Sequence, residues 1–152
     1  MANTQAMATS FKGELLNAYH NFSATNPART INTADSFKAA LYLASATVNA
    51  TTTAYSSTGE VTGTNYTAGG VAITSFSAPT TSGTTGFTTP TASFTYTNVT
   101  LSTAFDCVLV YNNSQTNRAV SAHTFGSQTV TAGTFTLTMP TNDATNALIR
   151  IA

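Results

Sequence analysis

Residues 105–125 read FDCVLVY, NNSQTN and RAVSAHTF in succession, and this stretch decides the fold. Residues 105–111 are a nearly continuous apolar run, which is typical of a central strand covered on both faces. Residues 112–117 are polar and rich in asparagine, a composition that favours a tight turn. Residues 118–125 then return as a second apolar strand. The stretch therefore predicts an antiparallel hairpin at the centre of a sheet.

Further short segments on either side alternate between apolar and polar residues or are apolar throughout, as half-buried or buried strands do. These segments are 36–43, 71–77, 92–99, 134–139 and 147–151. Seven or eight short strands separated by turn residues predict a mostly β fold, an antiparallel β-sandwich or jelly roll. Two stretches are expected to contain no strand: the polar residues 49–70, and residues 78–91, whose Pro, Gly, Thr and Ser predict an exposed loop.

The N-terminal region has a different periodicity. Residues 9–21 (TSFKGELLNAYHN) place Phe11, Leu15 and Tyr19 near one face of a helix, so this stretch is the best helix candidate. We expect an N-terminal arm or helix over residues 1–30 and a β-sandwich domain over residues 31–152.

The composition is poor in charge. Charged residues are 7% of the chain, against roughly 25% in a typical soluble domain, and threonine alone supplies about a fifth. Five Lys and Arg balance five Asp and Glu, which gives a formal net charge of zero. Such a surface has little electrostatic protection against association, so we expect much of it to be covered in an assembly.

The same balance excludes some classes of function. Nucleic-acid binding needs a basic face, and so does attraction to anionic membranes. No stretch approaches 18 consecutive apolar residues, the length that indicates a membrane-spanning helix. The start of the chain, MANTQAMATS, lacks the basic and apolar regions of a secretion signal. We therefore expect synthesis in a cytoplasm, with no nucleic-acid or membrane partner.

Few residues could carry catalysis. The five acids are well spread along the chain, and no nucleotide-binding or hydrolase motif is present. Cys107 and His123 fall on the two strands of the predicted hairpin and could form a nucleophilic couple, but a lone Cys in an apolar run is more often a small buried hydrophobe. His20 and His123 match no metal-ligand spacing. We expect no enzyme activity, cofactor or metal.

Two long runs carry a resemblance to a known group of proteins. Residues 37–70 read FKAALYLASATVNATTTAYSSTGEVTGTNYTAGG, and residues 107–151 read CVLVYNNSQTNRAVSAHTFGSQTVTAGTFTLTMPTNDATNALIRI. Together they resemble small proteins encoded among the structural genes of tailed bacteriophages. The resemblance implies a location in the virion and brings no catalytic residue with it.

Three classes of function remain open under this resemblance. The first is a capsid decoration (cement) protein that binds the outer surface of the head and stabilises it. Its partners would be the major capsid protein and other copies of itself, with a trimer as the expected state. The second is a tail, collar or fibre subunit that could bind a host glycan. The third is a cell-wall hydrolase, which the small number of acids disfavours.

Aromatic and apolar side chains are the candidate assembly contacts, because such residues anchor protein interfaces. Four of them belong to the N-terminal arm: Phe11, Leu15, Tyr19 and Phe22. The alternative is that these four pack back onto the sandwich of their own chain. Tyr55 and Tyr66 could contact a sugar or a neighbouring subunit, or could pack over the edge of the sandwich.

Overall fold

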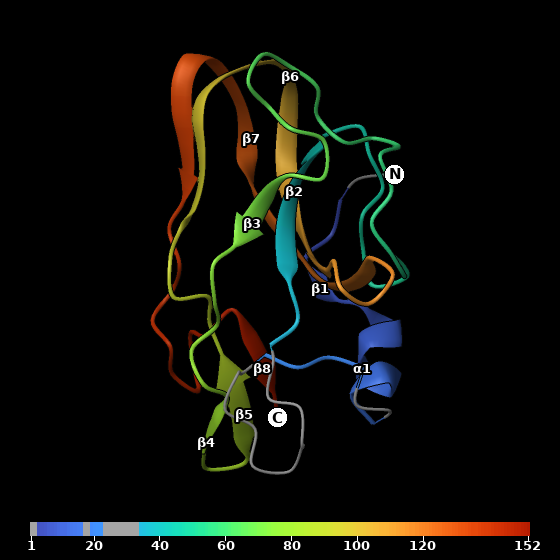
Figure 1. Ribbon diagram of the computed structural model, residues 1–152, viewed down its shortest axis with the longest axis vertical. Helices are drawn as coiled ribbons and strands as arrows, with labels where there is room; N and C mark the ends of the chain where they lie inside the picture. Colours follow the sequence, from blue (N-terminus) through green and yellow to red (C-terminus); the bar gives the residue numbers. More distant parts are fainter. Residues whose placement is uncertain (1–2, 17–18, 23–33) are drawn as a thin grey trace.

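The computed structural model describes residues 3–16, 19–22 and 34–152, and it is a mostly β protein with two antiparallel sheets (Figure 1). The larger sheet has the strand order β1-β7-β6-β2-β3, and the smaller has the order β4-β5-β8. The predicted antiparallel β-sandwich is confirmed. The elements are β1 (Ala6–Met7), α1 (Thr9–Leu16), β2 (Phe37–Leu43), β3 (Val71–Ile73), β4 (Thr80–Ser82), β5 (Thr85–Thr88), β6 (Phe94–Asn112), β7 (Arg118–Leu137) and β8 (Ile149–Ile151).

The long hairpin of β6 and β7 forms the centre of the molecule, as the stretch 105–125 predicts. The sequence predicts four separate strands here, and the structure joins them in pairs into two strands of 19 and 20 residues. Five register shifts interrupt the pairing of β6 with β7. Such bulges bend and twist a ribbon without ending it, so the polar residues between the predicted strands continue the ladder.

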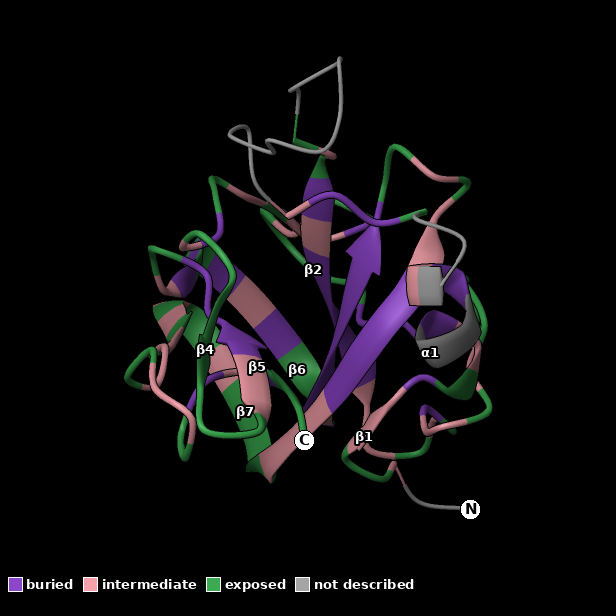
Figure 2. Ribbon diagram, turned by 90° about the horizontal axis from the view of Figure 1, so that it is seen from below, coloured by how far each residue is buried: buried purple, intermediate pink, exposed green. Residues whose placement is uncertain are grey.

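Buried residues concentrate on the central strands, and exposed ones lie in the surrounding loops (Figure 2). In β2 five of the seven residues are buried and the other two are half-buried, because both faces of the strand are covered. The largest fully buried side chains include Tyr111, Phe105 and Leu41 from β6 and β2, together with Phe11 from α1. The helix therefore contributes to the same core as the sheet.

Residues 78–91 differ from the prediction of an exposed loop. They contain β4 and β5, which pair Thr80 with Phe87 through Ser82 with Thr85. Gly83 at the turn has a φ of 59°, a conformation that glycine adopts without strain. Threonine is β-branched and suits an extended backbone. The threonines of this segment therefore favour a short hairpin, although the overall composition of the segment is that of a loop.

The helix is also shorter than predicted. It ends at Leu16, and the backbone N–H of Tyr19 donates to the carbonyl of Glu14, a bond that typically closes a helix end. Residues 17–18 of the predicted helix, and the predicted boundary between residues 30 and 31, lie outside the described residues. Strand β1 was not predicted, because two residues carry no periodic pattern.

Candidate functional site

The N-terminal arm, defined here as residues 3–16 and 19–22, lies along the sandwich. Asn3 fastens its beginning: Nδ2 donates to Leu43 O at 3.1 Å and to Asp106 Oδ1 at 2.6 Å, and Oδ1 accepts from Val48 N at 2.9 Å. Strand β1 then pairs with β7, with Ala6 opposite Ala122. The arm is thus tied to its own chain by backbone and side-chain bonds.

An apolar groove opens between the arm and the smaller sheet. It encloses about 260 Å³, and nearly all of its exposed lining is carbon. The arm supplies Phe11, Leu15 and Phe22, three of the predicted contact residues. The smaller sheet and the segment before it supply further residues that the sequence did not single out: Pro79, Thr80, Thr81, Gly86, Phe87, Thr88, Ile149 and Ile151.

Stacked aromatic rings fix the wall of this groove. Phe22 stacks on Phe37 of β2 at 4.7 Å between ring centroids and meets Phe76 edge-on at 4.9 Å. Phe11 is fully buried and lies 4.7 Å from the ring of His20. Aromatic pairs hold their rings in specific relative orientations, so this wall of the groove is rigid. Its rim is more open, because Ile151 remains 47% exposed.

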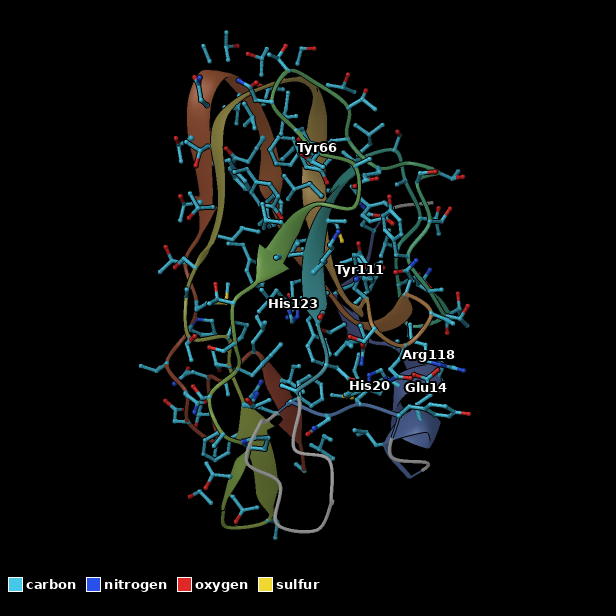
Figure 3. All side chains as sticks on the ribbon, viewed as in Figure 1. Glu14, His20, Tyr66, Tyr111, Arg118 and His123 are labelled. Carbon is cyan, nitrogen blue, oxygen red and sulfur yellow. The ribbon has the colours of Figure 1, made fainter. Side chains whose placement is uncertain are left out.

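A buried polar network holds the arm beside the groove (Figure 3). Glu14 accepts from His20 Nε2 at 2.7 Å and from Arg118 at the start of β7 at 2.6 Å. His20 also contacts Asn112 Nδ2 through Nδ1 at 3.1 Å. The same Asn112 amide donates to Asp35 Oδ2 at 2.8 Å. The network therefore joins the arm to both ends of the β6–β7 turn.

The hydrogen bonds of Asn112 orient the imidazole of His20. Oδ1 of Asn112 accepts from the backbone N–H groups of Ser114 and Gln115, so its Nδ2 donor group faces the imidazole. His20 Nδ1 must then accept, and Nε2 carries the hydrogen that it donates to Glu14. The His20 side chain is wholly buried.

Tyr19 is the predicted contact residue that stays on the surface. It is 41% exposed, and the guanidinium of Arg118 lies over its ring at 4.4 Å from the centroid. This contact is a cation–π pair. Tyr19 thus presents an aromatic face at the outer side of the arm.

Tyr55 and Tyr66 belong to a second cluster, built around the buried carboxylate of Glu60. Tyr55 donates its hydroxyl to Glu60 Oε2 at 2.7 Å, and Tyr66 donates to Oε1 at 2.8 Å. The backbone N–H of Gly69 also donates to Oε1, at 2.7 Å. Both hydroxyls are thus engaged within the chain, and together they hold residues 49–70 against the larger sheet.

Burial raises the pKa of every tyrosine in this cluster. It raises the pKa of Tyr42 and of Tyr111 to about 12, with the Glu60 carboxylate adding to the effect. The pKa values of Tyr55 and Tyr66 are raised further above 10, first by burial and then by the hydrogen bond to Glu60. These phenols are therefore neutral donors at any physiological pH.

Cys107 and His123 do not form a couple. A one-residue register shift between Val110 and Tyr111 pairs Cys107 with Thr124 and Val108 with His123. Directly opposed residues share a face, so the thiol and the imidazole point to opposite faces of the sheet. Burial raises the pKa of Cys107 to about 12 and lowers the pKa of His123 to about 4. His123 Nε2 instead contacts the hydroxyl of Ser121 at 2.8 Å.

The carboxylates of the chain serve as internal anchors. Glu14, Asp35, Glu60 and Asp106 take part in the contacts described above, and Asp143 accepts from the backbone N–H groups of Thr145 and Asn146 within its own turn. Among the described residues, no group of three or more His, Cys, Asp and Glu side chains could hold a metal ion. No helix in the described part of the chain is long and apolar enough to cross a membrane.

Neither a protein-family model, nor a curated protein, nor a solved structure matches this chain.

Proposed function

We propose that the protein is a structural subunit of a virion, and most specifically a bacteriophage capsid decoration protein that binds the outer surface of the head and stabilises it. The observation that carries this proposal is the placement of the acids. All five accept hydrogen bonds within the chain, in a protein whose charged residues are only 7% of the total. A surface with so few unpaired charges is better suited to burial between subunits than to exposure on a free monomer, because it gives little electrostatic protection against association.

The apolar groove is the proposed anchor point. Protein interfaces draw most of their affinity from a few aromatic and apolar groups in well-packed pockets. Here Phe11, Phe22 and Phe87 line such a pocket, and Ile151 stands exposed at its rim. None of the described residues that line the groove is charged, so the partner that we propose for it is an uncharged apolar segment. We assign that segment to the major capsid protein, in keeping with the resemblance of the sequence.

Stabilisation of the head would follow from linkage. A subunit that binds the assembled shell, and not free capsid subunits, shifts the equilibrium toward the shell. Copies of the chain arranged around a local symmetry axis, as a trimer, would also cover one another's uncharged surface. No catalytic step, cofactor or nucleic-acid contact is part of this function.

A charged substitution at the rim of the groove tests whether the groove binds the phage head. Heads assembled without this chain are incubated with the purified wild-type protein or with Ile151→Asp, and bound copies per head are measured by sedimentation and quantitative gel analysis. We expect Ile151→Asp to lower the apparent affinity at least about tenfold, which corresponds to roughly 1.4 kcal/mol. The control is Thr129→Asp, which adds the same charge at an exposed position of β7. Equal occupancy for all three proteins would contradict the groove as the anchor.

A further inference from the structure

A second, chemically different pocket lies on the larger sheet, away from the apolar groove. It encloses about 400 Å³ between the β2–β3 edge, the loop that precedes β3 and the first part of β6. Its lining combines one ammonium group, two aromatic rings, an amide and two hydroxyls. These belong to Lys38, Tyr66, Tyr96, Asn65, Thr67 and Thr97.

Hydrogen bonds to other parts of the chain fix the two tyrosine rings at this pocket. The rings of Tyr66 and Tyr96 stack at 6.0 Å with an interplanar angle of 18°. Tyr66 donates to Glu60 and accepts from Leu41 N at 3.0 Å, while Tyr96 donates to Ala39 O at 2.8 Å. Because both hydroxyls are fixed within the chain, the rings keep their orientation without a ligand, and the half-buried Tyr66, supported by the buried Tyr96, offers a preorganised apolar surface.

Polar groups surround that wall. Asn65 adopts a φ of 60° and donates through Nδ2 to Asn98 O at 2.8 Å, so its side chain is also oriented. Thr67 and Thr97 are exposed, and each hydroxyl can donate and accept. Lys38 adds three donors on a flexible stem. A rigid apolar surface with a few convergent donors and acceptors is typical of a small-molecule site.

The charges near the pocket favour an uncharged ligand. None of the lining residues is acidic. The ammonium of Lys38 lies 3.8 Å from where a β-carbon on Gly69 would be, and the N–H of Gly69 donates to Glu60. The positive and negative groups thus flank the same glycine, and each offsets the field of the other. Little net charge remains to select an anion.

We propose that this pocket binds a neutral, hydroxyl-rich ligand, namely one or two residues of a glycan. The carbon face of a sugar ring packs on Tyr66, which is half-buried and backed by the buried ring of Tyr96, and its hydroxyls exchange hydrogen bonds with Asn65, Thr67, Thr97 and Lys38. The site is separate from the apolar groove, so glycan binding and attachment to a particle are independent properties of the chain.

Saturation-transfer difference NMR tests the proposal on the full chain. The probes are the neutral disaccharides maltose, lactose, cellobiose and chitobiose, with 3′-sialyllactose as the charged counterpart of lactose. We expect transfer to at least one neutral disaccharide. Absence of transfer to every neutral probe at millimolar concentration, or transfer to 3′-sialyllactose alone, would overturn the proposal.

Two substitutions locate the binding. Asn65→Gly keeps the left-handed backbone accessible and removes the amide, and Lys38→Met keeps most of the stem and removes the ammonium. We expect each to weaken binding about fivefold to tenfold, the effect of losing one ligand hydrogen bond. The control, Asn142→Gly, removes an exposed amide outside the pocket. Unchanged affinity in both pocket variants would place the sugar elsewhere and contradict the proposal, whatever the result for the groove.

Discussion

The N-terminal arm and residues 49–70 are two largely irregular segments that pack on the same sheet, and each contains a buried glutamate that accepts several hydrogen bonds. In the arm, Glu14 is bound by the imidazole of His20 and by the guanidinium of Arg118. In residues 49–70, Glu60 is bound by the phenols of Tyr55 and Tyr66 and by a backbone N–H. The first carboxylate has a cationic partner, and the second relies on neutral donors.

The two segments also differ in what lies beside the carboxylate. Next to Glu14 the rings of Phe11 and Phe22 leave an apolar groove open to solvent, whereas around Glu60 the stacked tyrosines close the core. Tyr55 stacks on Tyr111 at 4.8 Å between centroids. The comparison indicates that residues 49–70 close the core around Glu60, whereas the arm leaves an apolar groove beside Glu14.

The largest expected effect is at Gly70, where residues 49–70 come closest to β2. A β-carbon at this position would lie 1.8 Å from Ala39 O, and the backbone has a φ of +74°. Gly70→Ala therefore requires the loop to move away from the strand, and we expect a loss of at least about 5 kcal/mol in the free energy of unfolding. Urea denaturation followed by circular dichroism measures it. The control is Gly83→Ala, where φ is +59° but nothing lies within 4 Å; equal losses in the two variants would show that backbone strain alone, and not the contact, decides.

The next effect compares the two glutamates directly. Glu60→Ala leaves two phenols and a backbone N–H without an acceptor in a buried site, and we expect a loss of about 3–5 kcal/mol. Glu14→Ala leaves one buried donor, His20 Nε2, without an acceptor, while Arg118 is one-third exposed and can reach water, so we expect only about 1–3 kcal/mol. The same denaturation measurement applies to both. A larger loss for Glu14→Ala would contradict the view that residues 49–70 are the more essential of the two.

A smaller effect concerns the stability of the folded chain at high pH. The pKa values of Tyr42 and Tyr111 are raised from 10 to about 12 by burial, so the folded chain holds these protons more tightly than the unfolded chain does. Their contribution to stability is fully present below pH 10 and is lost as the pH rises from 10 to 12. We expect the absorbance of ionised tyrosine at 295 nm to rise together with unfolding in this range. Ionisation of most tyrosines near pH 10 in a chain that stays folded would contradict the buried cluster.

Much of the fold could be predicted from the sequence, because it depends on local periodicity. The apolar run 105–111 and its partner 118–125 form the centre of the sheet, as expected. The register of that hairpin could not be predicted, since the shift near Tyr111 depends on tertiary packing, and this shift separates Cys107 from His123. The hairpin of β4 and β5 was missed because its threonines and glycines also have the composition of a loop.

The groove itself was not predicted, but some of the residues that line it were singled out from the sequence as candidate assembly contacts. Phe11, Leu15 and Phe22 were found from their helical or apolar spacing, and all three line the groove. Its other wall comes from Phe87 and Ile149, which are distant in sequence and meet the arm only through the fold. Phe87 carried a usable signal, as the one aromatic residue in residues 78–91. The roles of Glu14 and Glu60 left no signal in the sequence, because their partners, although most lie within nine residues along the chain, follow no periodic pattern.

The most direct test of the central claim, that this chain is a subunit on the surface of a phage head, is immunogold electron microscopy of intact particles with an antibody against the chain. We predict label spread over the head surface. Label confined to the tail or neck would replace the decoration role with that of a tail, collar or fibre subunit, and particles without any label would contradict a virion location altogether.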